Sequence, residues 1–236
     1  MNGGRRARAI LAFVIFALLR AWSADCLAER PSNWRLFKAE DGLKPTYSAS
    51  VSVSPLGNVW VKHGDADLIS VFDGFQIRTL PSPGHDYFRI YESRTGPLWS
   101  LYAGGLVLYI REQWVFHPVA EIRDEIKSDP LRQLRQIPLV PVDHNRILFL
   151  LSDKLMEYDA AAKQALVLKH VSETGLGKFF EMTEARDGGL WVTGAKGAAK
   201  FGGVVRHLRP GAACREYLVG DSLHAENLQK PFEEGS

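Results

Sequence analysis

The sequence predicts an all-β protein made of β-propeller blades, and two observations carry this prediction. A short turn phrase that ends in Trp or Leu recurs four times, with its last residues 39, 49 and 43 positions apart. An aromatic residue follows each copy after ten to twelve positions. The phrases are Leu56–Trp60, Thr95–Trp99, His144–Leu148 and Asp187–Trp191, and the aromatics are Phe72, Tyr109, Tyr158 and Phe201.

The residues around each phrase alternate between apolar and polar side chains, as in Tyr47–Val53, which is typical of strands rather than of helical repeats. Each unit therefore reads as four antiparallel strands in about 44 residues, the size of a propeller blade. A β-sandwich with coincidental Trp phrases is the rival interpretation. The predicted blades span about 44–80, 84–118, 132–171 and 176–209, and 223–236 is the start of a fifth, incomplete one.

The phrases also predict local structure. Glycine in three of them supplies the positive φ that a tight hairpin needs, and Asn145 is expected to take that role in the third copy. Glu121–Lys127, between the second and third units, is expected to form a short helical insertion. Large side chains at the end of each phrase are expected to pack between neighbouring blades. These inter-blade residues are Trp60, Trp99, Leu148 and Trp191.

The N-terminus predicts export. Three arginines precede the apolar run Ala9–Leu19, which is too short to span a bilayer, and Cys26–Ala28 ends in a small residue suited to cleavage. Residues 1–28 are therefore predicted to be a signal peptide, and 34–236 the propeller domain. An uncleaved anchor or a buried helix is the alternative. Periplasmic or secreted location follows from cleavage.

Charge and cysteine content exclude several functions. Residues 1–28 carry four Arg and one Asp, so removing this net +3 changes the chain from +2 to −1 and leaves no basic surface for nucleic acid. Only Cys214 would remain of the two cysteines, and no Cys/His metal spacing is present. We therefore expect no metal and no cofactor.

The phrase Trp34–Leu43 followed by the Gly-x-x-Trp units resembles the two-component regulator propeller family. The resemblance covers about residues 34–236 and is strongest in the first and fourth units, where Asp187–Gly194 reads DGGLWVTG. It implies an extracytoplasmic sensor region of a bacterial sensor kinase. Further implications are oligosaccharide ligands, a homodimer when full length, and transmembrane and kinase domains in a longer parent chain, which would anchor the protein in the membrane.

Four blades and the start of a fifth are fewer than the seven that the family implies. We therefore expect this chain to be either the N-terminal part of a longer protein or the product of a truncated gene, with a genuine small propeller as the alternative. It carries no kinase motif, no hydrolase or metalloprotease motif and no phosphate loop, so the chain itself is not expected to be an enzyme. A propeller enzyme of the lyase or quinone-dependent dehydrogenase type, and a passive protein-interaction scaffold, are the alternative functions.

The repeat geometry predicts a ligand site at the mouth of the central channel. Counting ten residues back from each turn glycine or its equivalent reaches one residue per blade. A tyrosine with mixed charges suits a polar ligand such as a sugar or uronate, because aromatics stack on sugar faces and Arg pairs with carboxylates. These predicted ligand-binding residues are Tyr47, Asp86, Arg135 and Lys178. His63 and His117 are expected to be solvated loop residues.

Overall fold

The computed structural model describes residues 35–44, 46–64, 66–84, 89–102, 104–128 and 137–218. The chain divides into two units, Met1–Phe37 and Lys38–Ser236, and every strand among the described residues belongs to the second. In the first unit only Arg35–Phe37 is described, with the Arg35 guanidinium over the ring of Phe37. The predicted signal peptide and the predicted start of a fifth blade lie outside the described residues.

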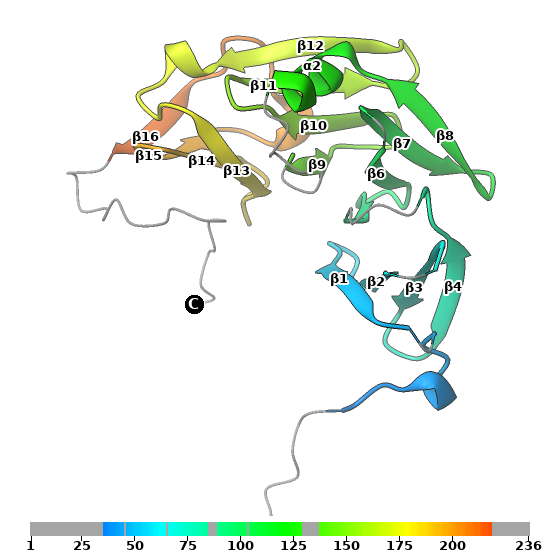
Figure 1. Cartoon of the computed structure of the whole chain (residues 1–236). Coiled ribbons are helices and arrows are strands. Elements are labelled where there is room, and N and C mark those ends of the chain that lie inside the picture. Colours follow the sequence, from blue (N-terminus) through cyan, green and yellow to red (C-terminus); the bar gives the residue numbers. More distant parts are fainter. Residues whose placement is uncertain are drawn as a thin grey trace, which may run out of the picture. The chain divides into compact units, whose positions relative to one another are not determined.

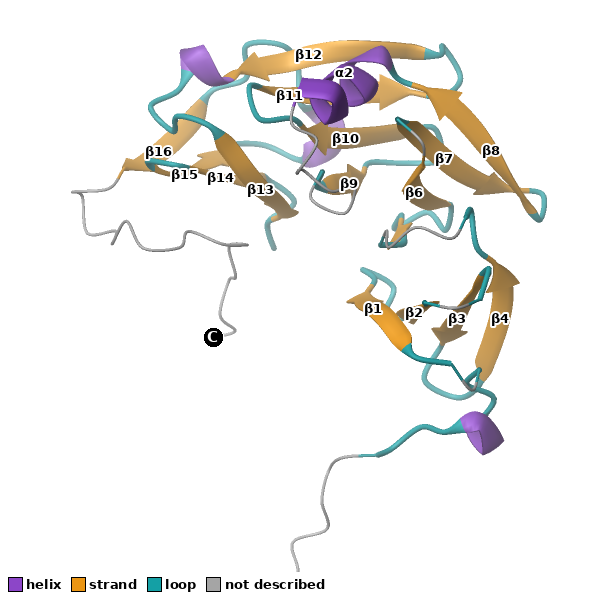
Figure 2. Ribbon diagram, viewed as in Figure 1, coloured by secondary structure: helices purple, strands orange, loops and turns teal. Residues whose placement is uncertain are grey.

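The described strands form four sheets of four antiparallel strands each, so the predicted all-β propeller fold is confirmed (Figures 1 and 2). Each sheet is a simple meander in which consecutive strands pair. The first two sheets contain β1 (Ser48–Val53), β2 (Val59–His63), β3 (Leu68–Phe72) and β4 (Ile77–Pro81), then β5 (Tyr91–Glu92), β6 (Leu98–Tyr102), β7 (Gly105–Ile110) and β8 (Gln113–Pro118). The last two contain β9 (Leu139–Pro141), β10 (Arg146–Leu150), β11 (Lys154–Asp159) and β12 (Gln164–His170), then β13 (Phe179–Glu184), β14 (Leu190–Gly194), β15 (Gly197–Phe201) and β16 (Cys214–Leu218).

The repeated phrases form the turns between the first and second strand of each sheet. Gly57, Gly96 and Gly188 occupy the left-handed region there, with φ of 84°, 102° and 81°. The expectation for Asn145 is wrong, because Asn145 is not among the described residues with positive φ. Instead, the Asp143 carboxylate accepts hydrogen bonds from the backbone amides of Asn145 and Arg146, both at 2.9 Å. The third turn is thus closed by an Asx-type side chain rather than by a left-handed residue.

Three hydrophobic clusters hold neighbouring sheets together, one for each pair of consecutive sheets. The clusters between sheets 2 and 3 and between sheets 3 and 4 each contain fourteen buried residues, whereas that between sheets 1 and 2 contains five. None of these three clusters joins sheet 4 to sheet 1. The core is therefore a series of blade interfaces, which is the packing of a propeller.

Two connecting segments add structure to the repeated sheets. The predicted insertion is confirmed as α2 (Ala120–Ser128), which buries Ile122 in the cluster between sheets 2 and 3. The last strand of sheet 4, β16, lies beyond residue 209, where the fourth unit was expected to end. A segment with the 3-10 turn η4 (Val205–His207) precedes β16 and buries Val205 and Leu208 between sheets 3 and 4, so the longer connection fills core space.

In the part of the chain that the structure describes, no helix is both long and apolar enough to cross a membrane.

Candidate functional site

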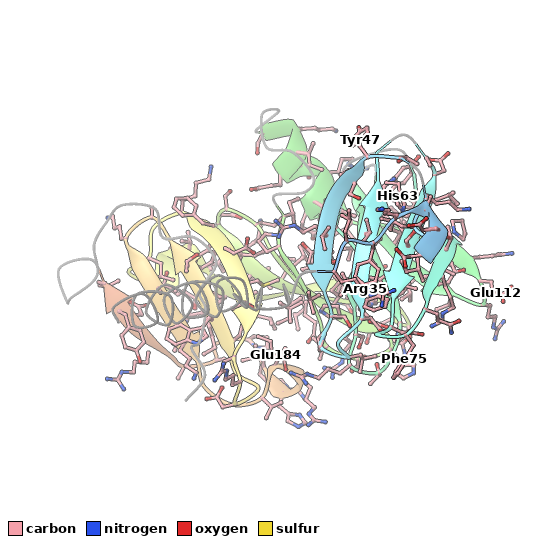
Figure 3. All side chains as sticks on the ribbon, turned by 90° about the horizontal axis from the view of Figure 1, so that it is seen from below. Arg35, Tyr47, His63, Phe75, Glu112 and Glu184 are labelled. Carbon is pink, nitrogen blue, oxygen red and sulfur yellow. The ribbon has the colours of Figure 1, made fainter. Side chains whose placement is uncertain are left out.

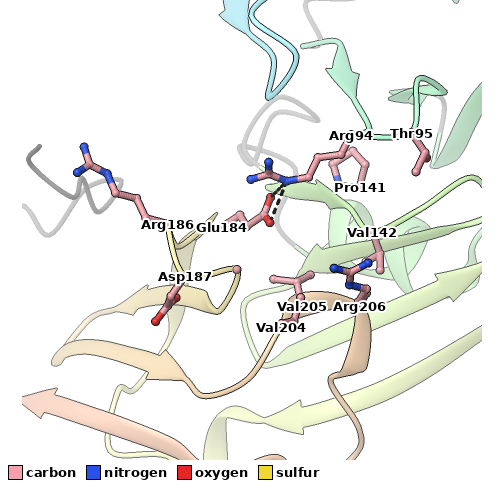
Figure 4. Close-up of a pocket in the computed structure, with 11 residues that line it drawn as sticks. Arg94, Thr95, Pro141, Val142, Glu184, Arg186, Asp187, Val204, Val205 and Arg206 are labelled. Carbon is pink, nitrogen blue, oxygen red and sulfur yellow. Dashed lines mark hydrogen bonds and ion pairs between the residues drawn. The ribbon is translucent and has the colours of Figure 1, made fainter.

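A pocket of about 340 Å³ opens where the turns of sheets 2, 3 and 4 meet (Figure 4). Its size lies at the lower end of the range for small-molecule sites. Each of the three sheets contributes the turn between its first and second strand, and the segment before β16 adds a fourth wall. The lining residues are Arg94, Thr95, Pro141, Val142, Glu184, Arg186, Asp187, Gly188, Val204, Val205 and Arg206.

Arg94 and Glu184 connect two blades that are not neighbours in sequence. The Arg94 Nε donates to both carboxylate oxygens of Glu184, each at 3.2 Å. The Arg94 side chain is 59% exposed and that of Glu184 is 21% exposed. An exposed pair of this kind stabilises a fold little, by about 0–1 kcal/mol. Because the pair is weak, an anionic ligand that competes with Glu184 can bind the Arg94 guanidinium.

Two other charged residues that line the pocket are Asp187 and Arg206. Asp187 pairs with Lys200 at 2.9 Å, and this hydrogen bond, with one from the Gly189 amide, holds the pKa of Asp187 below its ordinary value. The backbone carbonyl of Arg206 accepts a hydrogen bond from Arg146 at 3.2 Å, and Arg206 itself lines the pocket (Figure 4). Three arginines thus line the pocket together with two carboxylates, those of Glu184 and Asp187, and with apolar residues. A ligand with a carboxylate or phosphate can pair with the guanidinium groups.

The structure describes two of the four residues predicted at the channel mouth. Tyr47 is 49% exposed, and its ring lies against Gly64, where a Cβ would meet the ring carbons. Lys178 is exposed just before β13, and its carbonyl accepts a hydrogen bond from the Ala195 amide at 2.9 Å. Asp86 and Arg135 lie outside the described residues. The ring of four therefore stays a prediction.

Of the predicted ring, Tyr47 and Lys178 lie at the opposite end of the inner strands from the pocket. Tyr47 and Lys178 precede β1 and β13, whereas Glu184 is the last residue of β13. Figure 3 likewise shows Tyr47 and His63 at one end of the strands and Phe75 and Glu184 at the other. Sequence reasoning missed the pocket, although Arg94 and Arg186 each stand two positions before a turn glycine. That shared position was the available clue.

Three of the four predicted inter-blade residues are buried. Trp60, Trp99 and Leu148 are 4%, 0% and 0% exposed, and each belongs to the cluster that joins its sheet to the next. Trp191 is only partly buried, with its ring 5.6 Å from that of Tyr217.

The interface between sheets 1 and 2 contains a buried carboxylate that the sequence did not indicate. Glu92 is 8% exposed and accepts a hydrogen bond from the Trp60 indole at 3.0 Å. The Asn58 amide donates to both Glu92 oxygens, at 3.0 and 2.9 Å. We call Asn58, Trp60 and Glu92 the polar clasp. Because burying an anion is costly unless it is hydrogen-bonded, these donors make the carboxylate tolerable there.

The two histidines expected in solvated loops are both buried, so that expectation is wrong. His63 ends β2 at 0% exposed and bonds to the Ser70 hydroxyl at 2.8 Å, and His117 lies in β8 at 7% exposed, 3.2 Å from the Tyr158 hydroxyl. Burial lowers the pKa of both, with smaller contributions from Lys62 and Lys44 at His63 and from Lys163 at His117. Alternation did not indicate this burial, because Val61, two positions before His63, is partly exposed and Val115, two positions before His117, is 37% exposed.

Comparison with known proteins returns similar folds only. No family model matches the chain, and no curated relative matches it. Among solved structures, virginiamycin B lyase from Staphylococcus aureus is 14% identical with a TM-score of 0.46, covering 75% of this chain and 56% of that one. A streptogramin B lyase is 15% identical, with a TM-score of 0.49 and the same coverage of 75% and 56%.

The extracellular domain of a protein described as a hybrid two component system from Bacteroides thetaiotaomicron is 14% identical, with a TM-score of 0.45. That match covers 78% of this chain and 26% of the other. This chain thus spans about half the length of the lyases and a quarter of the extracellular domain. At these identities and scores no activity is transferred from these proteins.

Proposed function

We propose that the chain is an extracytoplasmic ligand-sensing region of a two-component signalling protein, without catalytic activity of its own. The observation that carries the proposal is the pocket built from the turns of three blades and lined by guanidinium groups. The resemblance of Trp34–Leu43 and of the repeated phrases to two-component regulator propellers supports the signalling role. Export of the chain is part of the same proposal.

The ligand that this pocket suits is a polar molecule with a negative charge, such as an acidic oligosaccharide. Arg94 and Arg206 supply donors for a carboxylate, while Val142, Val204 and Val205 supply apolar surface for the rest of the molecule. A uronate meets both requirements, because its ring faces are apolar and its carboxylate accepts two parallel hydrogen bonds from a guanidinium.

Binding would act on the arrangement of the blades. A ligand carboxylate that takes over Arg94 releases Glu184, and so replaces a bond between sheets 2 and 4 by bonds through the ligand. A ligand shifts an equilibrium only by its difference in affinity for two states, and the Arg94–Glu184 pair provides such a difference here. In a longer parent chain, this change would bias the output domain.

Titration calorimetry with trigalacturonate, compared with neutral maltotriose, tests the proposal. We expect heat of binding with the acidic sugar alone, and a loss of at least tenfold in affinity in Arg94→Ala and Arg206→Ala. Arg123→Ala is the matched control, because Arg123 is 57% exposed on α2 and does not line the pocket. Equal binding by all variants, or no binding of either sugar, contradicts the assignment of this pocket.

The alternative functions make different predictions. A propeller enzyme would convert a substrate, and substitution of a side chain that transfers protons would lower its activity. A passive scaffold would bind a protein and show no stabilisation by small molecules. The predicted channel-mouth ring makes a prediction of its own, namely that Tyr47→Ala and Lys178→Ala weaken sugar binding while Arg94→Ala does not.

A further inference from the structure

A second pocket, of about 250 Å³, lies between sheets 1 and 2, where the hydrophobic cluster between blades is smallest. It shares no lining residue with the pocket between blades 2, 3 and 4, so binding here is independent of the function proposed for that pocket. Pockets for drug-sized ligands begin at about 300 Å³, and this one is therefore suited to a single small molecule. Two rows of paired side chains face each other across it.

The two rows follow from the register of the strands. Residues paired across antiparallel strands project from the same face of a sheet. One row crosses β2, β3 and β4 of sheet 1, and the other crosses β5, β6 and β7 of sheet 2. The paired residues that line the pocket are Trp60, Val71 and Arg78 on sheet 1, and Glu92, Leu98 and Tyr109 on sheet 2. One wall of the pocket thus carries a positive side chain and the other a negative one.

The next blade interface has uncharged residues at both of these positions. Val115 holds in sheet 2 the register position that Arg78 holds in sheet 1. Pro141 holds in sheet 3 the position that Glu92 holds in sheet 2. That interface has a cluster of fourteen buried residues, whereas the one between sheets 1 and 2 has five. The two charges therefore stand where apolar packing would stabilise the interface more, which indicates a binding role.

The Glu92 carboxylate can accept one more hydrogen bond. Its Oε2 accepts from the Trp60 indole and the Asn58 amide, whereas Oε1 accepts from Asn58 alone among the described residues. A carboxylate has about four acceptor positions, so one on Oε1 remains. Because Glu92 is only 8% exposed, an ammonium group bound there would pair with a largely desolvated charge, and the aromatic rings of Trp60 and Tyr109 in the same pocket can attract it further.

The Arg78 guanidinium supplies the opposite charge from the facing wall. Its side chain is 62% exposed and forms a long ion pair with Asp73, at 3.8 Å, and none with Glu92 among the described residues. Asp73 does not depend on this pair, because its carboxylate also accepts hydrogen bonds from the backbone amides of Phe75 and Gln76. Arg78 can therefore exchange Asp73 for a ligand carboxylate, with which a guanidinium forms two parallel hydrogen bonds.

We propose that this pocket binds one apolar α-amino acid of about the size of leucine in its zwitterionic form. The ammonium group binds Glu92 and the carboxylate binds Arg78, while the side chain of the amino acid packs on Val71, Leu80 and Leu98. Since the two charges belong to different sheets, the bound amino acid joins blades 1 and 2. Binding therefore stabilises the interface that has the smallest hydrophobic cluster.

Titration calorimetry of the full chain with L-leucine tests the proposal. Isoamylamine keeps the ammonium group and the apolar chain of leucine without its carboxylate, and isocaproate keeps the carboxylate without the ammonium group. We expect leucine to bind at least tenfold more tightly than either analogue. No heat of binding with leucine, or equal affinity for leucine and both analogues, overturns the proposal.

Two variants assign the charges of leucine to the two walls. Arg78→Gln should lower the affinity for leucine at least tenfold and leave isoamylamine unaffected, and circular dichroism should show an unchanged fold because Arg78 is largely exposed. Glu92→Gln should likewise weaken leucine and leave isocaproate unaffected. Arg123→Gln is the matched control, because Arg123 is 57% exposed on α2 and does not line the pocket.

Hydrogen exchange locates the bound leucine. We expect leucine to slow exchange in β2 and in β6, one strand from each wall, and to have no such effect in Arg78→Gln. An unchanged affinity for leucine in Arg78→Gln, or protection confined to sheets 3 and 4, overturns the assignment of this pocket to an amino acid.

Discussion

The interface between blades 1 and 2 differs in kind from the two interfaces that follow it. Sheets 2, 3 and 4 are joined by clusters of fourteen buried residues each, whereas the cluster between sheets 1 and 2 has five and is supplemented by the polar clasp. The third blade lacks the Trp of the repeat, yet Leu148 is 0% exposed, because the neighbouring aliphatic side chains fill the space.

The difference shows that the Trp phrase alone does not determine how strongly packing against its neighbour stabilises a blade. Burial of apolar surface stabilises by about 25 cal/mol per Å², so the two large clusters dominate the stability of sheets 2 to 4. Blade 1 depends more on a few directional bonds, in which the loss of one partner leaves a buried charge unsatisfied. We therefore expect blade 1 to unfold at lower free energy than the rest.

The largest effect is expected from Phe149→Ala at the interface between sheets 2 and 3. Phe149 is 0% exposed, and its truncation leaves a cavity, so the free energy of unfolding should fall by ~3–5 kcal/mol. Urea denaturation measures the loss. Phe75→Ala is the control, because Phe75 is 96% exposed and its change should stay within ~0.5 kcal/mol. Equal losses in the two variants would contradict the comparison.

Glu92→Gln tests the polar clasp at nearly constant volume. The single oxygen of a glutamine can still accept from the Trp60 indole and the Asn58 amide, but its NH2 group then faces the Asn58 amide donor where Glu92 has its second acceptor oxygen. Because these two donors oppose each other and the negative charge is lost, stability should fall by ~1–3 kcal/mol. Hydrogen exchange should locate the loss in β1 to β4. Glu112→Gln, in the turn between β7 and β8, is the matched control and should change nothing. Loosening spread over all four sheets would argue against a local role for Glu92.

Acid should destabilise the protein through His63 and His117. Because burial lowers the pKa of both in the folded chain, the unfolded chain binds more protons below its ordinary value of about 6.5. Stability is therefore fully present above pH ~6.5 and declines as pH falls, by at most ~1.4 kcal/mol per pH unit for each histidine. Urea denaturation between pH 7.5 and 5 measures this slope.

His117→Asn should flatten part of that slope, whereas His144→Asn should leave it unchanged, since His144 is exposed. A wild-type slope in His117→Asn would show that another group carries the acid sensitivity.

The smallest effect on stability is expected from Arg94→Ala. The Arg94 side chain is 59% exposed in its pair with Glu184, so the loss of the pair should cost about 0–1 kcal/mol, although the same change should remove most of the affinity for an acidic sugar. Denaturation and calorimetry on one preparation separate the two effects. A fall of more than ~2 kcal/mol in the free energy of unfolding would mean that Arg94 has a structural role. A small change in affinity would mean that Arg94 does not bind the ligand.

The repeated phrases were sufficient to predict the fold, because hairpin glycines and alternating strands are local features. Glu121–Lys127 was predictable as a helix for the same reason. The extension to β16 was not, because Val205 and Leu208 are buried by a connection that has no counterpart in the other units. The burial of His63 and His117 likewise depends on what faces each strand, which alternation alone does not reveal.

The site was less predictable than the fold. Arg94 and Glu184 are 90 positions apart, and only the packing of sheets 2, 3 and 4 brings their turns together. Local patterns in the sequence pointed instead to Tyr47 and Lys178, at the other end of the strands. Glu92 had no sequence signature, since its role depends on a Trp and an Asn from the previous blade.

The most direct test of the account is hydrogen exchange of the chain with and without trigalacturonate. We predict that the ligand slows exchange in the turns that contain Arg94, Glu184 and Arg206, while neutral maltotriose changes nothing. Protection around Tyr47 and Lys178 instead, or no protection by either sugar, would contradict the placement of the ligand site in the pocket between blades 2, 3 and 4.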